Sequence, residues 1–286
     1  MKKINKVLIA NRGEIALRII RACKELEIKS VAVFSEVDVD GLWVKKADEC
    51  YPIMGDVVQA YLDYEKIISI AKKSDCDAIH PGYGFLSENA DFARACEENG
   101  LIFIGPKPEH IELFGDKMAS KVAMKKVGVP VLEGTDEPIT DIEEGARIAK
   151  EIGFPVIIKA AFGGGGRGMR IVREEKDFKE LFESASNEAK KYFGRGEAFI
   201  EKYVENPRHI EIQVIADKYG NVLHLGERDC SIQRRHQKVI EIAPSPLLNN
   251  EARKELYRIA TKAMFKLGYE SVGTVEFLVD ENDNIY

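Results

Sequence analysis

Residues 159–168 read Lys-Ala-Ala-Phe-Gly-Gly-Gly-Gly-Arg-Gly, a strand-like end that runs into a loop almost without side chains. Glycines let backbone amides turn toward an anion without steric cost, and concave rows of such amides bind phosphate. Lys159 stands directly before the loop and would add a positive charge. Because Val156 to Lys159 and Met169 to Val172 predict flanking strands, we interpret the glycines as a lid over a nucleotide; a merely flexible linker is the alternative.

The spacing of the glycines disfavours two common nucleotide folds. No Gly-Lys-Ser/Thr follows the loop at the required distance, so the loop is not a Walker A motif. Asn11-Arg12-Gly13-Glu14, which follows the first strand-like run, is not the Gly-x-Gly-x-x-Gly of dinucleotide sites. The lid therefore indicates another kind of nucleotide site.

The segment before the lid predicts a separate α/β domain. Short β-branched runs alternate with helical patterns up to residue 105, and among these runs are Val7 to Ala10, Val31 to Phe34 and Ile102 to Ile104. Such alternation is typical of a doubly wound parallel sheet. We expect a Rossmann-like domain over 1–114 and a helical linker over 115–130, where Gly128-Val129-Pro130 marks a hinge.

The lid itself and the segment after it predict two further parts. We expect a small α/β lid subdomain over 131–203. Over 204–286 apolar residues recur at every second position from Ile210, which predicts an antiparallel sheet. Residues 274–286 read as a strand, a turn and the first two residues of a return strand. Because strands usually run about five or six residues, we interpret the chain as a fragment with a truncated sheet.

Composition narrows the class of protein. The 286 residues are enough for about two domains, and 45% of them are apolar. The 42 basic and 48 acidic residues give a net charge of −6, which argues against a general nucleic-acid or anionic-membrane binder. Apolar runs are far shorter than the roughly 18 residues of a membrane span, and the first residues lack a secretory pattern. We expect a cytoplasmic protein with no nucleic-acid or membrane partner. The five cysteines have no close spacing and are interpreted as reduced, mostly buried thiols.

A basic stretch in this acidic chain is the second chemical signal. Residues 228–238 read Arg-Asp-Cys-Ser-Ile-Gln-Arg-Arg-His-Gln-Lys. In an extended segment Arg234, His236 and Lys238 would project from one face, where three donors suit a polyanion such as triphosphate. The alternative is a solvated charged strand. RNA binding is disfavoured because aromatic residues are not interleaved with the charges.

Two glutamates lie on predicted strands. Glu276 alternates with apolar neighbours in 274–278, so its carboxylate should point away from the core with Thr274. One or two carboxylates together with substrate phosphates commonly hold Mg²⁺, although no obvious second carboxylate follows it. Glu201, in Phe-Ile-Glu-Lys-Tyr-Val at 199–204, would lie where backbone groups could meet an adenine edge; an ordinary strand is the alternative.

Together these stretches resemble biotin carboxylase, an ATP-grasp enzyme, over essentially the whole chain. The resemblance rests on long, ordered motifs: Ile-Ala-Asn-Arg-Gly-Glu-Ile-Ala at 9–16, His-Pro-Gly-Tyr-Gly-Phe-Leu-Ser-Glu-Asn at 80–89, Gly-Asp-Lys at 115–117, the glycine loop, Glu-Asn-Pro-Arg-His at 205–209 and the basic stretch. Details such as Lys159-Ala-Ala-Phe, Lys-Val-Ile-Glu-Ile-Ala-Pro at 238–244 and Gly-Thr-Val-Glu-Phe-Leu-Val-Asp at 273–280 are more similar to the pyruvate carboxylase branch than to bacterial acetyl-CoA carboxylase.

The resemblance implies a fold and a reaction. The fold would be a Rossmann-like (pre-ATP-grasp) parallel-sheet domain followed by an ATP-grasp fold with a small α/β lid and an incomplete antiparallel sheet. In the reaction, bicarbonate attacks the γ-phosphoryl group of ATP, and the resulting carboxyphosphate yields CO₂ that carboxylates a ring nitrogen of biotin. Pyruvate would be the final acceptor in the pyruvate carboxylase branch. Mg²⁺, or Mn²⁺ in its place, would accompany ATP, and biotin would arrive on a carrier as substrate.

The resemblance also implies roles for individual residues. Lys117 and Lys159 would meet the phosphates, and Gly165 and Gly166 would cover them. Adenine would be held by Glu201, Lys202, Tyr203 and Val204, and the nucleotide site would be completed by His209, Gln233, His236 and Leu278. Lys238, with His236, would serve catalysis beside bicarbonate or the γ-phosphate, and Glu276 would bind the metal.

The sequence departs from this family at the carboxyl end, where the second magnesium glutamate and the bicarbonate-binding arginine, glutamine and glutamate are expected. In other phosphoryl transferases a missing charge-stabilising arginine costs about 10³ to 10⁵ in rate, so we expect the chain alone to be nearly inactive. Expected partners are bicarbonate, a biotinylated carrier, a carboxyltransferase domain or subunit, and a second copy in a homo-oligomer.

Other functions stay open on the sequence alone. The biotin carboxylase subunit of acetyl-CoA carboxylase is one, and a nucleotide-binding or subunit-interaction module without turnover is another. Carbamoyl-phosphate synthase or a purine ligase would share the lid but not residues 80–89 or 233–238. A Rossmann oxidoreductase is the most distant alternative.

Overall fold

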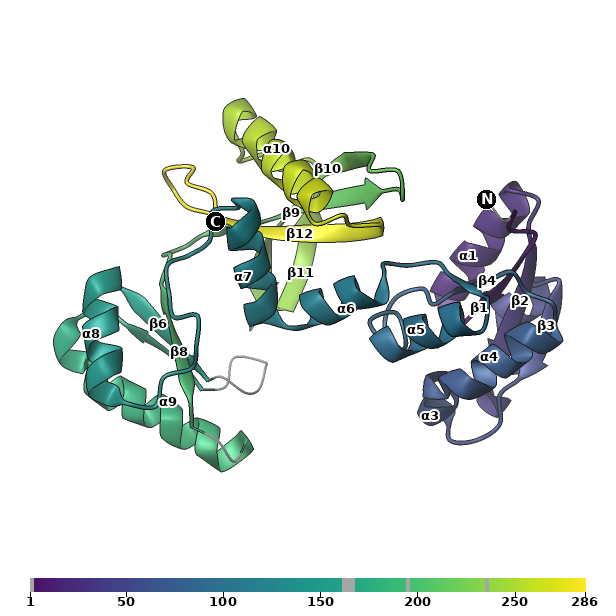
Figure 1. Ribbon diagram of the computed structural model, residues 1–286, viewed down its shortest axis with the longest axis horizontal. Helices are drawn as coiled ribbons and strands as arrows, with labels where there is room; N and C mark the ends of the chain where they lie inside the picture. The colour runs from purple at the N-terminus through teal and green to yellow at the C-terminus, as the bar shows by residue number, and fades with distance from the viewer. Residues whose placement is uncertain (1–2, 161–167, 194–195, 235–236) are drawn as a thin grey trace. The chain divides into compact units, whose positions relative to one another are not determined.

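The computed structural model describes residues 3–160, 168–193, 196–234 and 237–286 (Figure 1). The chain divides into two compact units. The first comprises Met1–Lys117 with the short segments Ala216–Gly220 and Gly268–Val272, and the second comprises Met118–Ile215, Asn221–Leu267 and Gly273–Tyr286. Within the described ranges no helix combines the length and the apolar character that a membrane crossing would require.

The first unit contains a five-stranded sheet in the order β3-β2-β1-β4-β5. Its strands are β1 (Lys6–Ile9), β2 (Lys29–Phe34), β3 (Glu49–Pro52), β4 (Ala78–His80) and β5 (Ile102–Phe103). Every neighbouring pair is parallel. The strand order reverses between β1 and β4, which is the switch point where open α/β sheets commonly bind ligands. The doubly wound parallel sheet predicted from the sequence is confirmed.

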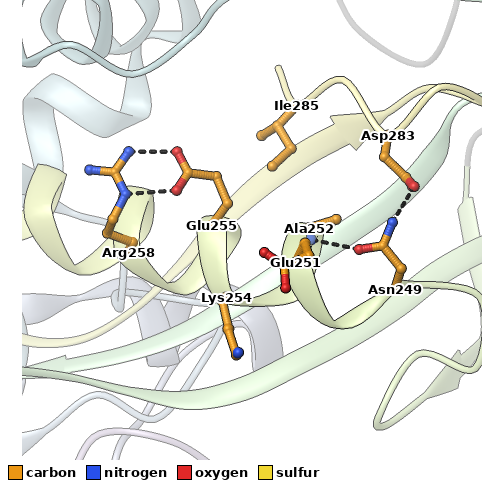
Figure 2. Close-up of a pocket in the computed structure, with 8 residues that line it drawn as sticks. All are labelled: Asn249, Glu251, Ala252, Lys254, Glu255, Arg258, Asp283 and Ile285. Atoms are coloured by element: carbon orange, nitrogen blue, oxygen red, sulfur yellow. Dashed lines mark hydrogen bonds and ion pairs between the residues drawn. The ribbon is translucent and has the colours of Figure 1, made fainter.

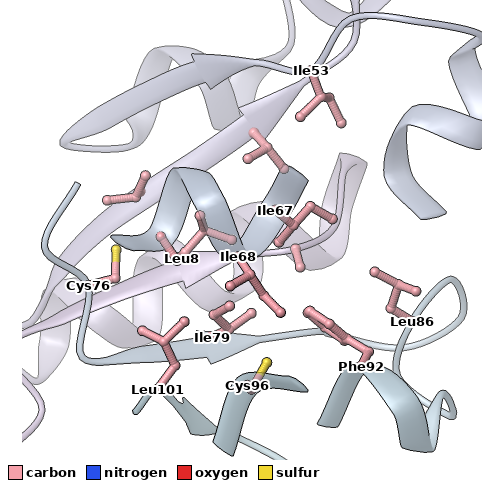
Figure 3. Packing of buried hydrophobic residues seen from close by; sticks show 14 of the residues in the cluster. Leu8, Ile53, Ile67, Ile68, Cys76, Ile79, Leu86, Phe92, Cys96 and Leu101 are labelled. Atoms are coloured by element: carbon pink, nitrogen blue, oxygen red, sulfur yellow. The ribbon is translucent and has the colours of Figure 1, made fainter. Parts of the chain in front are cut away.

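Helices cover both faces of this sheet. They are α1 (Gly13–Glu25), α2 (Leu42–Lys46), α3 (Val57–Leu62), α4 (Tyr64–Lys73) and α5 (Ala90–Glu98), with a 3₁₀ turn at Glu36–Asp38. The helix α6 (Pro108–Gly115) follows β5 and contacts α5. Alternate residues of β1 enter different cores: Leu8 packs with residues of α4 and α5, as Figure 3 shows, whereas Val7 and Ile9 pack with α1. Burial on both faces explains why the inner strands β1, β2 and β4 read as continuous apolar runs.

Trp43 and Tyr61 are buried in the core of the first unit and form hydrogen bonds there. Trp43 is buried, and its indole Nε1 donates to Val33 O at 3.2 Å. The Tyr61 hydroxyl is fully buried and donates to Asp38 Oδ2 at 2.8 Å, while it accepts from the Ser35 backbone N–H at 3.1 Å. These hydrogen bonds satisfy polar groups that would otherwise cost free energy on burial.

The second unit begins with α7 (Lys117–Val127, whose first residue belongs to the first unit) and a three-stranded antiparallel sheet. The sheet has the order β7-β6-β8, from β6 (Val156–Ala160), β7 (Met169–Val172) and β8 (Ala198–Lys202). Two helices, α8 (Ile142–Ile152) and α9 (Phe178–Phe193), pack on one face through a buried cluster that includes Ala149, Phe178 and Phe182 (Figure 1). The predicted small α/β lid is therefore present, and its second strand has the predicted bounds.

A four-stranded sheet completes the second unit, in the order β11-β10-β9-β12. It is formed by β9 (Arg208–Ala216), β10 (Val222–Arg234), β11 (Gln237–Ile242) and β12 (Ser271–Val279), and α10 (Asn250–Lys266) packs against β10. An antiparallel bridge joins Val279 to Ile285, so the predicted strand, turn and return are confirmed. On β12, Val275 and Phe277 are buried while Thr274 and Glu276 are exposed, as their alternation predicts.

The single extended strand predicted over the basic stretch is wrong. β10 ends at Arg234 and β11 begins at Gln237, and the two strands pair antiparallel. Gln233 lies opposite Lys238, and Arg234 lies opposite Gln237. Because directly opposite residues share a face and successive residues alternate, Arg234 and Lys238 point to different faces of the sheet. The period-two pattern is the same in β10 and in β11, so periodicity alone did not reveal two paired strands.

Candidate functional site

Lys159 and Glu201 come together on the sheet β7-β6-β8, called the lid sheet here. They lie on its open face, which is the face opposite α8 and α9. In the antiparallel register Ile157 lies opposite Glu201 and Lys159 lies opposite Phe199. Lys159 and Glu201 are therefore diagonal neighbours on one face, a separation that long side chains span. The opposite face carries the buried Val156, Ile158 and other apolar residues of the core. Alternation along β6 and β8 thus places the two charged side chains together on the face opposite the apolar core.

A third charged side chain, Lys121 of α7, joins this pair. Lys121 Nζ donates to Glu201 Oε1 at 2.6 Å, and Lys159 Nζ donates to the other oxygen, Oε2. The side chains of Lys121 and Glu201 are only 17% and 16% exposed. Burial would raise the pKa of Glu201, but the charges and hydrogen bonds of Lys159 and Lys121 outweigh it and hold that pKa below its ordinary value. Glu201 is therefore an ionised carboxylate between two cations.

The second charged cluster surrounds Lys238 in the four-stranded sheet. Lys238 Nζ donates to Glu276 Oε1 at 2.6 Å and to Glu211 Oε1. Glu211 is only 7% exposed and also accepts from Arg228 at 2.8 Å, whereas Glu276 is 70% exposed. Burial would lower the pKa of Lys238, but the two carboxylates outweigh it and raise that pKa well above its ordinary value. Lys238 therefore keeps its proton at any physiological pH.

The two carboxylates of this cluster fit a magnesium site that is completed by a nucleotide. Glu211 and Glu276 come from β9 and β12 and converge on the same ammonium group. Mg²⁺ favours oxygen ligands, and it is usually held by one or two carboxylates plus substrate phosphates. Across the described ranges no three His, Cys, Asp or Glu side chains form a metal cage of their own. The donor set therefore suits a metal that arrives with phosphates.

The other predicted nucleotide residues lie along the strands of the same unit. The Lys202 ammonium donates to Gly153 O at 2.8 Å and to Phe154 O at 3.1 Å, and the Tyr203 N–H donates to Pro155 O at 3.1 Å. The His209 N–H donates to Ser231 Oγ at 3.1 Å. These bonds fix the path of the chain at the end of the lid and at the start of β9.

The remaining predicted residues lie at several places along the chain, and three of them are outside the described ranges. Gln233 donates to Cys230 O at 3.0 Å and faces the same side as Lys238. Leu278 exchanges two backbone hydrogen bonds of 2.8 Å with Tyr286, and Val204 is half-buried. Lys117 is exposed at the first position of α7. Three predictions, Gly165, Gly166 and His236, lie outside the described residues. The roles assigned to the site residues stay predictions.

Sequence reasoning missed Lys121 and Glu211. Lys121 lies four residues after Lys117 on α7, so a helical pattern places both on one side of that helix. Glu211 is a buried carboxylate between Ile210 and Ile212 of β9, a position that demands a cationic partner. The helical spacing and the apolar flanks were therefore available as signals, but the partners became visible only in three dimensions.

A hollow on α10 is unrelated to these clusters. Figure 2 shows that it is lined by charged side chains of α10 and by residues of the turn after β12. Arg258 pairs with Glu255, and the Asn249 amide donates to Asp283, so these groups bind one another. None of the nucleotide residues predicted from the sequence lines it. The charged clusters on the two sheets are therefore the better candidate site.

Comparisons with known proteins agree over the whole chain. Residues 3–111 match the family described as biotin carboxylase, N-terminal domain, and residues 116–286 match the family described as carbamoyl-phosphate synthase L chain, ATP binding domain. The 2-oxoglutarate carboxylase small subunit of Hydrogenobacter thermophilus is 56% identical over 98% of this chain and 60% of that protein. Pyruvate carboxylase of Bacillus subtilis is 54% identical over 99% of this chain and 25% of that enzyme.

A solved structure extends the likeness to three dimensions. The biotin carboxylase domain dimer of the H. thermophilus 2-oxoglutarate carboxylase, in complex with MgADP, ADP and bicarbonate, superposes with a TM-score of 0.86 at 55% identity. The match covers 100% of this chain and 63% of that one. The chain thus spans about 60% of the shorter relatives and a quarter of the pyruvate carboxylase. Its two matched families, its α/β and antiparallel sheets and its identity to these relatives show that the chain belongs to the biotin carboxylase family of ATP-grasp proteins.

Proposed function

We propose that this chain binds MgATP for the ATP- and bicarbonate-dependent carboxylation of biotin, as the biotin carboxylase component of a pyruvate carboxylase. The observation that carries the proposal is the cluster at Lys238, which unites a protonated ammonium group with the carboxylates of Glu211 and Glu276. Phosphoryl transfer needs mainly positioning and cations that face the transferred group. This cluster supplies one such cation and a donor set suited to a metal.

The proposed roles follow from charge and position. Lys159, on the open face of the lid sheet, meets the phosphates with Lys117, while the backbone of 201–204 holds adenine. Lys238 faces the γ-phosphate or the bicarbonate and cannot act as a general base, because its pKa is raised. Glu276 and Glu211 would hold Mg²⁺, which when bound neutralises charge on the phosphates. Bicarbonate oxygen attacks the γ-phosphorus, ADP leaves, and carboxyphosphate forms.

The remaining chemistry concerns carbon dioxide and biotin. Carboxyphosphate breaks down to CO₂ and phosphate, and the ring nitrogen of biotin bonds to CO₂ as it loses its proton. Water would destroy carboxyphosphate, so a lid that closes over the nucleotide is a functional requirement. We propose that Gly165 and Gly166 belong to this lid and that His209, Gln233, His236 and Leu278 complete the nucleotide site.

Partners and location are part of the same proposal. Biotin arrives on a carrier domain or protein, and the carboxyl group passes to a carboxyltransferase domain or subunit that serves pyruvate. We propose a homo-oligomer in the cytoplasm, with the division 1–114, 115–130, 131–203 and 204–286 as its structural segments. The biotin carboxylase subunit of an acetyl-CoA carboxylase, or of a carboxylase that acts on 2-oxoglutarate, would use the same site and differ in the final acceptor.

The test is MgATP binding by titration calorimetry on the chain 1–286 and on Lys159→Ala. The loss of one charge-assisted contact to phosphate should weaken binding at least tenfold, which corresponds to about 1.4 kcal/mol. Lys150→Ala is the matched control, because Lys150 is an exposed lysine of α8 that pairs with Glu175 at 3.0 Å. Binding that is equal in all three proteins would remove Lys159 from the site, and no binding by the unaltered chain would overturn the proposed nucleotide function.

A further inference from the structure

The carboxylate of Glu201 is shared between two lysines from different elements. Oε1 accepts from Lys121 of α7 at 2.6 Å, and Oε2 accepts from Lys159 of β6. Lys121 and Glu201 are largely buried, whereas Lys159 is 41% exposed at the edge of the group. The arrangement is asymmetric: one lysine is enclosed with the carboxylate, and the other has access to solvent and to a ligand.

This sharing matters because the ammonium group of Lys159 has two competing anionic partners. Without nucleotide it is neutralised by Glu201. When it turns to a phosphate, it leaves a carboxylate that is only 16% exposed. A buried charge that loses its only partner is strongly unfavourable. The carboxylate can release Lys159 at low cost only if another cation remains beside it.

We propose that Lys121 is a positioning residue of the nucleotide site, which keeps Glu201 paired so that Lys159 is free to bind the triphosphate. This inference rests on the proposed MgATP binding. Lys121 does not touch the nucleotide in this arrangement; it acts through Glu201. The ion pair between Lys121 and Glu201 is retained in both states, and only the contact between Lys159 and Glu201 is exchanged for one with phosphate.

The packing of α7 supports a fixed position for Lys121. The Lys266 ammonium of α10 donates to Val127 O, the last residue of α7, at 2.7 Å. This bond satisfies a carbonyl that a helix end leaves without a partner, and a cation is favoured there by the helix dipole. The helix is therefore tied to the second unit at its C-terminal end, while Lys121 ties its middle to β8.

The same helix offers a matched control. Lys125 lies one turn after Lys121, its side chain is 60% exposed, and its nitrogen lies 3.8 Å from Asp136. Lys121→Met and Lys125→Met remove the same charge from the same helix, but only the first removes a partner of Glu201. Lys121→Arg keeps the cation and tests for rescue. A general loss of charge or of helix stability would affect the two methionine variants alike.

The experiment measures MgATP affinity by calorimetry for the unaltered chain and these three variants. Lys121→Met should bind about tenfold more weakly, because a hydrogen bond to a charged group contributes about 1.5–3 kcal/mol and about 1.4 kcal/mol is tenfold. Lys121→Arg and Lys125→Met should stay within about twofold of the unaltered chain. Unchanged affinity in Lys121→Met, or an equal loss in Lys125→Met, overturns the inference.

A second measurement separates action through Glu201 from direct contact with phosphate. In a Glu201→Gln background Lys159 has no carboxylate to leave, so Lys121→Met should change MgATP affinity by less than about twofold. A full tenfold loss in that background means that Lys121 meets the nucleotide itself, and the inference falls. If the unaltered chain does not bind MgATP at all, the proposed function fails first and the inference falls with it.

Discussion

A buried carboxylate at the junction of β10 and α10 leads to a quantitative stability prediction. Glu227 is 1% exposed, and its Oε1 accepts from Arg253 Nε at 2.7 Å. The same oxygen accepts from the Ser245 N–H at 3.2 Å, and the other oxygen accepts from the Tyr257 hydroxyl. Glu227→Gln keeps the shape and one acceptor oxygen for Arg253 and the Ser245 N–H, but it removes the charge that faces Arg253 and places an amide NH2 donor against the Tyr257 hydroxyl.

The expected loss follows from that one contact. A hydrogen bond to a charged group contributes about 1.5–3 kcal/mol, and the partial exposure of Arg253, at 23%, favours the lower half of this range. Glu227→Gln should therefore lower the free energy of unfolding by about 2 kcal/mol at neutral pH. Glu255→Gln is the control, because Glu255 lies on α10, the helix that carries Arg253, but pairs with Arg258 at the surface, where such pairs contribute about 0–1 kcal/mol.

The pH dependence of the free energy of unfolding gives an independent check of the ionic contribution of Glu227. Burial would raise the pKa of Glu227, but Tyr257 and Arg253 outweigh it and hold that pKa below its ordinary value of 4.5. The folded chain then binds fewer protons than the unfolded chain, so this stabilisation is complete above about pH 4.5 and is lost as the pH falls through the folded-state pKa. Urea unfolding followed by circular dichroism should show a difference between the two proteins that shrinks in acid. A difference that is the same at neutral and acidic pH would refute the ionic origin.

Two further predictions concern the first unit and the thiols. Tyr61→Phe should lower the free energy of unfolding in urea by about 1–2 kcal/mol, because Asp38 and the Ser35 N–H lose a buried partner. Since burial raises the pKa of Tyr61 to about 12, ultraviolet titration of the native chain should show that this phenol ionises after the exposed tyrosines, and simultaneous ionisation would contradict its burial. Among the cysteines Cys50 is exposed and the other four are buried, and burial raises the pKa of Cys96 to about 12. Ellman's reagent near neutral pH should therefore label one thiol quickly. A fast phase that persists in Cys50→Ser would mean that a buried thiol is accessible.

The fold could be predicted from the sequence where local pattern and burial agree. The runs of β1, β2 and β4 are buried on both faces, and alternation with helical patterns leaves few other arrangements. The lid strand Met169–Val172 and the turn after Val279 were likewise predicted correctly, because glycine and a polar run mark their ends. These elements depend on residues that are neighbours in the sequence.

The candidate site was predictable only in part, because its contacts join distant residues. Glu201 and Lys121 are 80 positions apart, and Lys238 and Glu211 are 27 apart. The paired strands β10 and β11 both have a period-two pattern, so a single long strand satisfies the same pattern. Which charges face each other depends on strand register and helix placement, and the sequence pattern specifies neither for these residues.

The position of Trp43 has a practical spectroscopic consequence. It is the only tryptophan of the chain, and it belongs to the first unit, where it is buried and hydrogen-bonded to Val33. Its emission is a local signal of that core, whereas far-ultraviolet dichroism records the helices of both units. A stopped-flow instrument that records both signals can therefore time the assembly of the parallel sheet separately from that of the second unit, without any added label.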